Sequence, residues 1–401
     1  MRQKVVVIGH GYTSRLGIIR SLAELDCEIT VIAIVFHGWL GRCFHFYGGK
    51  PIDCHSKYVH RMFYCIAKNE QRLIKLLLEK CSDPTQKVIV IPDSDFSAAV
   101  IDKNQEQLKE FFLFPHINHT PGAVEHWMDK TLQKKAAMEI GMNVANGQII
   151  AIKNHAYILP QSITYPCFVK PLRTVGGGKK YLKRCGNESE LINLLDEVAS
   201  CMDIEMLVED YKTIDNEYAV VGFSDGENVT IPCVMEFVTN TISHFGVARE
   251  GRIEFIAGFE PLLSQLKEFV KRVGFCGLFD IDFYESDCKL YFGEMNLRFG
   301  ASGYAVTKMG VNLPAMLVKH LKGEDYSGVT QRLANTATYV NERMCLDDWC
   351  YGHITENEFR MIIQKANIKF VYDDADMGPQ IAFERKIKLF QTKRFLKKLL
   401  K

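Results

Sequence analysis

Acidic and amide side chains alternate with apolar residues in two neighbouring runs near residue 290. Asp280 and Asp282 lie two apart in the first run, and Glu294, Asn296 and Arg298 lie two apart in the second. Because residues two apart on a strand share a face, a hairpin of the two runs would bring these side chains together. Carboxylate and amide oxygens are suitable ligands for Mg²⁺. A solvated sheet face is the alternative, but the intervening apolar positions favour a functional site.

A lysine and a glycine-rich loop form a second candidate site. Lys170 ends an apolar run, and Arg173-Thr-Val-Gly-Gly-Gly-Lys179 follows at once. Consecutive glycines allow the backbone to curl around phosphate oxygens, and the flanking cations supply charge. A flexible hairpin turn is the alternative. The lysine immediately before the loop favours phosphate binding.

The segment Gly9-His10-Gly11 follows the first apolar run and is a weaker signal. It lacks the third glycine of a dinucleotide fingerprint, because Ser14 holds that position, and no acidic residue ends the second apolar run. We interpret it either as a tight turn between strand and helix or as a contact for an anion or small substrate at the helix start.

These candidates need a scaffold, and the first 118 residues predict a parallel sheet covered by helices. Short, continuously apolar runs alternate with helical patterns, which is typical of strands buried on both faces. Strands are predicted at 5–8, 28–35 and 87–92, and helices at 14–25, 70–80 and 104–111.

The remainder of the chain has a different pattern. Residues 145–215 form a small strand-rich unit whose helix begins at an Asn187-x-x-Glu190 capping box. Residues 217–297 alternate with period two and are interrupted by a helix at 264–273, and another helix follows at 312–321. The last 75 or so residues form a smaller appended unit.

Composition excludes several classes of protein. The chain has 401 residues, enough for two or three domains, and 49 Lys and Arg against 48 Asp and Glu give no general reason to bind nucleic acid. No apolar run reaches the ~20 residues that span a bilayer. Thirteen cysteines without a CxxC pair indicate a reducing compartment, so we expect a cytoplasmic protein. A homo-oligomer is left open.

The basic tail at 386–401 has apolar residues that could form one helix face. That face would either pack on the body of the protein or lie on an anionic membrane surface, and we favour packing. The residues are Leu389, Phe390, Phe395, Leu396, Leu399 and Leu400.

Taken in order, these motifs resemble an ATP-grasp ligase over about 120–325. The resemblance rests on Met-Asp-Lys130, Phe-Val-Lys170-Pro, the glycine loop, Val-Glu209-Asp-Tyr with Glu217 after it, and Glu294-x-Asn-x-Arg. It is greatest for the carboxylate–amine ligase branch that contains D-aspartate ligase and carbamoyl-phosphate-synthase-like proteins. The implied fold is α/β, more narrowly α+β ATP-grasp. Its units would be a Rossmann-like pre-ATP-grasp domain at 1–118, an ATP-grasp domain at 119–325 with a lid at about 145–215, and a C-terminal extension at 326–401 with the basic tail.

The resemblance also implies site residues and cofactors, namely ATP with Mg²⁺, or Mn²⁺ as an alternative. The ATP phosphates would contact Lys130, Lys170, Thr174, Gly176, Gly177 and Gly178. Glu209 and the backbone at Tyr211 would hold the adenine, and Glu217 the ribose. The metal ligands would be Asp282, Glu294 and Asn296, with Asp280 an open alternative to Asp282. Arg298 and Lys170 would be catalytic.

The implied enzyme activates a carboxylate as an acyl phosphate, releases ADP, and joins the acyl group to an amine as an amide. Its partners would be a small carboxylate and a small amine. Two alternatives stay open: formation of an acyl phosphate or carbamoyl phosphate without an amine acceptor of its own, and a non-catalytic ATP-binding module. The complete set of acidic, amide and arginine residues argues against the second alternative.

Overall fold

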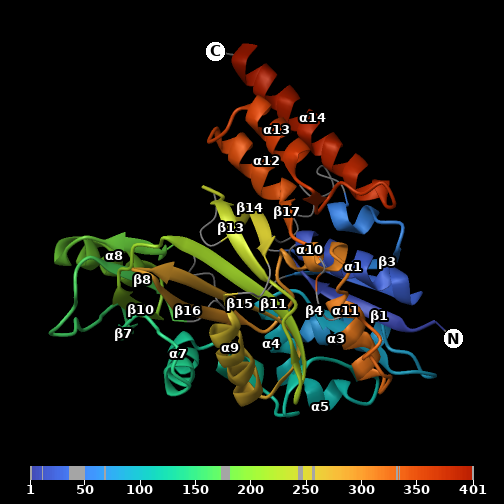
Figure 1. Cartoon of the computed structure of the whole chain (residues 1–401), viewed down its shortest axis with the longest axis horizontal. Helices are drawn as coiled ribbons and strands as arrows, with labels where there is room; N and C mark the ends of the chain where they lie inside the picture. Colours follow the sequence, from blue (N-terminus) through green and yellow to red (C-terminus); the bar gives the residue numbers. More distant parts are fainter. Residues whose placement is uncertain are drawn as a thin grey trace.

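Strand order divides the chain into three sheets (Figure 1). The computed structural model describes residues 2–10, 12–35, 50–66, 69–172, 181–242, 247–254, 258–330, 333 and 335–399. Within these ranges the sheets have five, four and nine strands. No helix in this part of the chain is long and apolar enough to cross a membrane.

The five-stranded sheet is parallel, and its order is β3-β2-β1-β4-β5. Its strands are β1 (Lys4–Gly9), β2 (Glu28–Val35), β3 (Val59–Ile66), β4 (Val88–Pro92) and β5 (Phe112–Leu113). Its helices are α1 (Tyr12–Leu22), α3 (Glu70–Lys80), α4 (Asp95–Lys103) and α5 (Gln105–Leu108). The predicted parallel sheet is confirmed, and strand order reverses between β1 and β4, where α/β sheets commonly bind ligands.

Two predictions for this sheet are wrong in detail. The predicted helix at 104–111 is only the four-residue α5, and α4 precedes it, begun by a capping box in which Ser94 and Ser97 exchange hydrogen bonds. Strand β3 was not predicted because it is an edge strand whose side chains are mostly half-buried or exposed, so it lacks a continuous apolar run.

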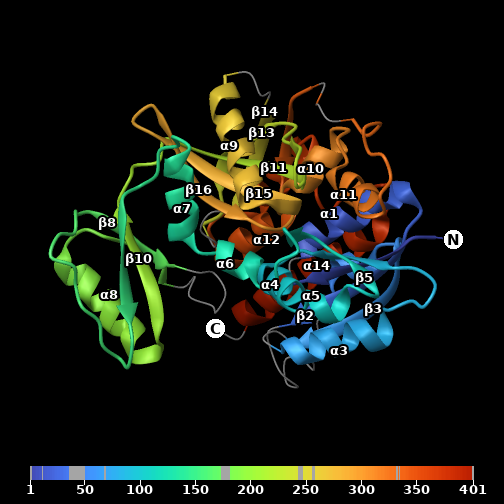
Figure 2. The same ribbon diagram turned by 90° about the horizontal axis from the view of Figure 1, so that it is seen from below.

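A four-stranded sheet with one covering helix forms a lobe that projects from the body, shown in green in Figures 1 and 2. The order is β7-β10-β8-β9, with β7 (Gly147–Ile152), β8 (Cys167–Pro171), β9 (Lys183–Cys185), β10 (Ile204–Asp210) and α8 (Glu188–Cys201). The predicted cap of α8 is confirmed, because the Asn187 side chain accepts a hydrogen bond from the Glu190 amide at 3.0 Å. We call residues 147–210 the lid lobe.

The nine-stranded sheet has the main path β16-β15-β11-β13-β14-β17-β18, with β12 beside β11 and β6 beside β15. Its strands are β6 (His116–Ile117), β11 (Asn216–Asp225), β12 (Val229–Thr230), β13 (Val234–Asn240), β14 (Ala248–Glu254), β15 (Phe275–Ser286), β16 (Lys289–Asn296), β17 (Ala337–Val340) and β18 (Ile368–Lys369).

Both faces of this sheet are buried. One core includes side chains of α9 (Glu260–Val273), α6 (Ala123–Trp127) and α7 (Lys130–Glu139). The other includes side chains of α1, α10 (Gly303–Lys308) and α11 (Leu313–Leu321) and continues to β1 and β2. The predicted helix at 264–273 begins earlier, at Glu260, because Pro261 is well suited to its first turn.

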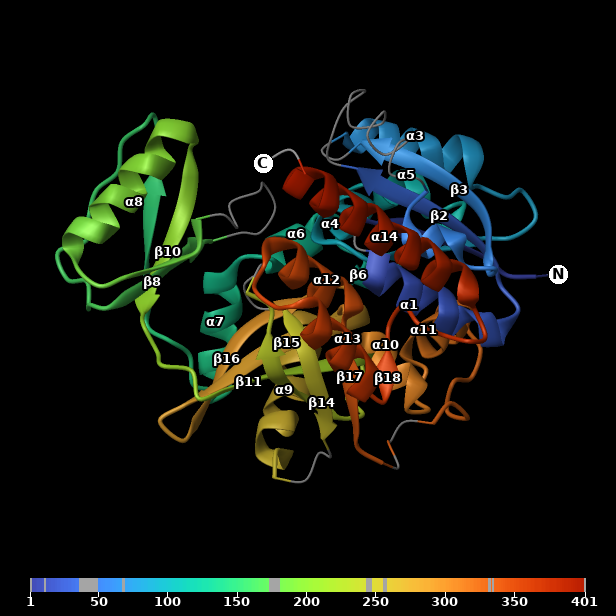
Figure 3. The ribbon, with the colours of Figure 1, turned by 90° about the horizontal axis from the view of Figure 1, so that it is seen from above.

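The C-terminal residues are built into this sheet rather than attached beside it. Strand β17 pairs with β14, and α12 (Glu342–Tyr351), α13 (Glu356–Lys365) and α14 (Met377–Leu399) follow (Figure 3). Helix α14 packs through buried Phe383 and Ile387, and Phe390 meets Trp349 edge-on at 5.2 Å. Leu389, which was predicted on the same face as Phe390, is 46% exposed.

This packing favours docking of α14 on the protein over a membrane-bound helix. The apolar side chains predicted further along the tail, those of Phe395, Leu396, Leu399 and Leu400, lie outside the described residues. The evidence for docking therefore comes from the first half of the helix.

Candidate functional site

The β15–β16 hairpin brings the predicted acidic and amide residues onto one face. Asp280 lies opposite Asn296, and Asp282 lies opposite Glu294. Burial, together with the charge of Glu294, raises the pKa of Asp280 to about 6. Burial and the neighbouring Asp280 and Glu294 also raise the pKa of Asp282. The carboxyl groups of this face therefore lie so close together that they resist being ionised at the same time.

Helix α7 places lysines over this face. Asp129 caps the helix, and Gln133 fixes it to β16 by accepting from the Met295 amide at 2.8 Å and donating to the Met295 carbonyl at 2.9 Å. Lys130, in the first turn, forms an ion pair with Glu294. Lys134, one turn later on the same side of the helix, points to the lid lobe.

The lid lobe contributes Lys170 from β8 and Glu209 from β10. Lys170 lies opposite Leu207, so Glu209, two residues further on, shares its face. The Glu209 carboxylate is buried between Lys170, whose Nζ is 2.8 Å from Oε2, and Lys134, which pairs with the other oxygen. Burial and the charge of Lys130 lower the pKa of Lys170 to about 8. Glu209 thus pairs with two lysines, and its single negative charge balances only one of them.

Tyr211 and Glu217 are the predicted contacts for adenine and ribose, and both follow Glu209 in the chain. The Tyr211 amide donates to the Pro166 carbonyl at 3.0 Å, and its ring lies 4.9 Å from the Arg184 guanidinium carbon. Glu217 lies opposite Tyr284 on the same sheet face as Asp282, and its carboxylate accepts from Asn240. It borders a cavity of about 400 Å³ lined by Ile214, Asp215, Asn216, Glu217, Glu236, Phe237, Val238, Asn240 and Arg252.

Arg298 connects the hairpin to the N-terminal sheet. Its Nε donates to Asp95 Oδ1 at 2.9 Å, and its Nη2 donates to Asn296 Oδ1 at 3.1 Å. Asp95 is the first residue of α4, shortly after β4. Sequence analysis predicted the position of Arg298 but not its pairing with Asp95.

We call these residues the charged cluster: Asp95, Lys130, Lys134, Lys170, Glu209, Asp280, Asp282, Glu294, Asn296 and Arg298. Sequence analysis missed Lys134, although its spacing of four from Lys130 on a helix was a usable signal.

The predicted phosphate-loop residues Thr174, Gly176, Gly177 and Gly178 lie outside the described residues. Within the described residues, no three acidic, cysteine or histidine side chains are grouped so that they could hold a metal ion. The predicted metal set has only two carboxylates, and Lys130 engages one of them.

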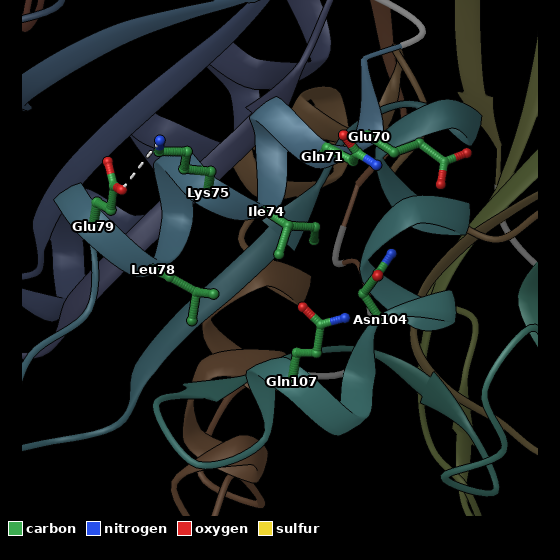
Figure 4. Close-up of a pocket in the computed structure, with 8 residues that line it drawn as sticks. All are labelled: Glu70, Gln71, Ile74, Lys75, Leu78, Glu79, Asn104 and Gln107. Atoms are coloured by element: carbon green, nitrogen blue, oxygen red, sulfur yellow. Dashed lines mark ion pairs between the residues drawn. The ribbon is translucent and has the colours of Figure 1, made fainter.

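A separate groove of about 530 Å³ lies between α3 and the start of α5 (Figure 4). Its lining residues are Glu70, Gln71, Ile74, Lys75, Leu78, Glu79, Asn104 and Gln107. Its one ion pair among these residues joins Lys75 to Glu79, one turn apart on α3, at 3.6 Å. The lining residues of the groove do not bring together several charged side chains from different elements, as the charged cluster does. We therefore place the candidate site at the charged cluster.

Comparison with known proteins gives the family. Residues 129–326 match the family model described as "Carbamoyl-phosphate synthase L chain, ATP binding domain". This segment, about half of the chain, is thus similar to an ATP-grasp ATP-binding domain. The matched segment contains every described member of the charged cluster except Asp95.

Curated ATP-grasp relatives include two carbamoyl phosphate synthase large chains. The protein of Gemmatimonas aurantiaca is 26% identical over 232 residues, which are 56% of this chain and 21% of the relative. That of Agathobacter rectalis is 26% identical over 224 residues, 54% of this chain and 21% of the relative. The match thus covers about a fifth of the length of these relatives.

Solved ATP-grasp structures share the fold over most of the chain. N5-carboxyaminoimidazole synthetase from Staphylococcus aureus has a TM-score of 0.63 at 16% identity and covers 90% of this chain and 88% of its own. L-amino acid ligase from Bacillus licheniformis has a TM-score of 0.59 at 15% identity, and the match covers 84% of this chain and 79% of the ligase. The predicted ATP-grasp fold, with its N-terminal parallel sheet, is therefore confirmed.

Proposed function

We propose that this protein is an ATP-dependent ligase that activates a carboxylate as an acyl phosphate, releases ADP, and joins the acyl group to an amine. One observation carries the proposal. Lys130 of α7 pairs with Glu294 on the acidic face of the β15–β16 hairpin, Arg298 follows that hairpin, and Lys134 and Lys170 meet at Glu209 of the lid lobe. That arrangement suits a ligand that carries both metal and phosphate charge.

In this proposal Asp282, Glu294 and Asn296 hold Mg²⁺, or Mn²⁺, with Asp280 as the alternative to Asp282. The residues fit a hard cation because their donor atoms are all oxygen and the two aspartates form no direct ion pair among the described residues, so a cation would favour their ionised forms. The bound ion would supply positive charge at the phosphates. Glu294 would exchange Lys130 for the ion, which frees Lys130 to contact phosphate.

The remaining residues would bind the nucleotide. Lys130, Lys170 and the loop residues Thr174, Gly176, Gly177 and Gly178 would contact the phosphates. Glu217 would hold the ribose hydroxyls at the mouth of its cavity. Glu209 with the backbone at Tyr211 would lie at the adenine, and the two lysines paired with Glu209 would fix its carboxylate.

The chemical problem for the enzyme is charge repulsion. A carboxylate must approach an ATP phosphate chain that already carries several negative charges, so catalysis depends on positioning and on fixed positive charge. Arg298 can pair with the transferred phosphoryl group through charge-assisted hydrogen bonds. Asp95 would act as a positioning residue by holding the Arg298 side chain at Nε. Closure of the lid lobe would exclude water from the acyl phosphate.

We also propose that the protein works in the cytoplasm on two small molecules, a carboxylate and an amine. The buried cysteines that the structure describes, such as Cys54 and Cys233, carry free thiols, which agrees with a reducing compartment. A homo-oligomer is part of the proposal, because one ATP-grasp neighbour, the biotin carboxylase domain of Hydrogenobacter thermophilus 2-oxoglutarate carboxylase, was solved as a dimer.

A screen of carboxylate and amine pairs tests the function. We expect Mg²⁺-dependent release of ADP that requires both substrates, and hydroxylamine should trap the acyl phosphate when the amine is left out. Release of AMP would contradict the proposed chemistry. Binding of ATP without turnover of any pair would favour a non-catalytic module.

A further inference from the structure

Two cations from the C-terminal helices flank the ring of Tyr12, the first residue of α1. The guanidinium carbon of Arg343, on α12, is 5.0 Å from the ring centroid. The Nζ of Lys386, on α14, is 5.7 Å from it. In Figure 3, a view from above, the red α14 overlies the region of α1. Two helices that are distant in sequence from β1 thus bring positive charge close to its end.

Arg343 and Lys386 differ from two arginines of α1, Arg15 and Arg20, in how closely carboxylates hold them. Arg15 is held by both oxygens of Asp53, at 2.8 and 3.0 Å, and Arg20 donates to Asp376 at 3.0 Å. The carboxylate nearest to Arg343 is Asp347, one turn along the same helix at 3.8 Å. The charges nearest to Lys386 include those of Asp53 and Asp347, which favour its charged form. Asp53 already holds Arg15 with both oxygens, and Asp347 is shared with Arg343, so the cations at Tyr12 outnumber the carboxylates left to pair with them. An excess of positive charge favours the binding of an anion.

The position lies next to the charged cluster. His10 follows β1, two residues before Tyr12. Desolvation by the surrounding protein lowers the pKa of His10 to about 4, with further contributions from the charges of Arg298, Arg15 and Arg343. One imidazole therefore lies within electrostatic reach of both Arg298 and Arg343. The site is also at the reversal of strand order between β1 and β4.

We propose that Arg343 and Lys386 bind an anionic group of the substrate, a carboxylate or a phosphate ester, beside Tyr12. The inference rests on the proposed function and narrows it: one of the two molecules joined by the ligase carries an anionic group in addition to the group that reacts. The reacting group would lie toward Arg298 and the second anion toward α12 and α14. The C-terminal residues would then select the substrate.

Binding of succinate and inorganic phosphate to the full chain tests this site. Isothermal titration should show that Arg343→Met and Lys386→Met each weaken binding of at least one probe by about tenfold or more, as expected for the loss of a charge-assisted hydrogen bond. Mg-ATP affinity should stay within about twofold. Arg360→Met on α13 and Lys388→Met on α14 are controls that remove exposed charges elsewhere.

The outcomes separate the sources of the anion. Succinate bound more tightly than phosphate indicates a carboxylate substrate, and the reverse indicates a phosphate ester. Arg343→Lys and Lys386→Arg should restore most of the affinity, which excludes misfolding as the cause. Equal affinity in wild type and both Met variants, or no binding of either probe, overturns the proposal. Charge-dependent probe binding without ADP release from any substrate pair would count against the ligase function and not against this site.

Discussion

The two halves of the charged cluster handle charge in opposite ways. On the lid side, Glu209 is buried between Lys134 and Lys170, so every one of these charged groups has a direct partner within the chain. On the hairpin side, Lys130 pairs with Glu294, but Asp280 and Asp282 have no direct ion pair among the described residues. The comparison indicates that the lid side pairs its charges within the chain, whereas the hairpin side leaves two carboxyl groups for the cation that we propose.

The most severe change should be the loss of a ligand on the hairpin side. Glu294→Ala should lower kcat by about 10²–10³, the range seen when one transition-state stabilising group is lost. The measurement is ADP release at saturating Mg²⁺. Glu268→Ala, which removes an exposed carboxylate on α9, is the control and should be near wild type. Near-normal ADP release by Glu294→Ala would contradict the proposal that the hairpin side, unlike the lid side, holds the cation.

Arg298 tests whether the hairpin side performs chemistry or only balances charge. Arg298→Met should lower kcat by about 10² while ATP affinity changes only a few-fold, because the lost contact is with the transferred group. The measurements are ATP affinity and hydroxylamine-trapped acyl phosphate.

The partner variant Asp95→Asn sharpens this result. It keeps the arginine but removes the carboxylate that holds Nε at 2.9 Å, so we expect a smaller decrease in kcat than in Arg298→Met. Normal trapping by Arg298→Met together with a lowered thermal midpoint would show that the residue is structural.

Local sequence patterns predicted what depends on neighbouring residues. The continuously apolar strands β1, β2 and β4 and the shared face of Glu294 and Asn296 follow from periodicity. Short strands such as β17 and β18 have too few residues to show a pattern, and their pairing depends on distant residues.

The same limit applies to the site. The pairs Lys134–Glu209 and Arg298–Asp95 join residues 75 and 203 positions apart, so no local signal specifies them. Spacing predicted which residues would face the site, and the tertiary structure decided which of them pair.

A milder effect is expected on the lid side. Lys134→Met leaves Glu209 with Lys170 alone and removes the ion pair between α7 and the lid lobe. We expect Mg-ATP affinity to fall about 5–10-fold, equivalent to about 1 kcal/mol, with kcat little changed. Lys135→Met, on the exposed side of α7, is the control. A larger loss of kcat in Lys134→Met than in Arg298→Met would show that the lid side contributes more to catalysis than the hairpin side.

The smallest effect on the chemistry is expected outside both halves. Phe383→Ala on α14 should cost about 3–5 kcal/mol of stability, because it empties a buried position, with little change in ATP affinity. Leu389→Ala on the same helix should be nearly neutral, since that side chain is 46% exposed. Chemical denaturation measures both. Equal stability of the two variants would show that α14 does not pack through Phe383.

The anchoring of α1 has a consequence for biosynthesis. Arg20 of α1 is buried, and its guanidinium donates to Asp376 and to the carbonyls of Phe370 and Val371, some 350 residues later in the chain. A ribosome adds about 5–20 residues per second, so roughly 20–70 s separate the synthesis of the arginine from that of its acceptors. Throughout that interval the charge has no partner, and burying it alone would be strongly unfavourable. The first helix of the chain can therefore take its final place only after residue 376 has left the ribosome.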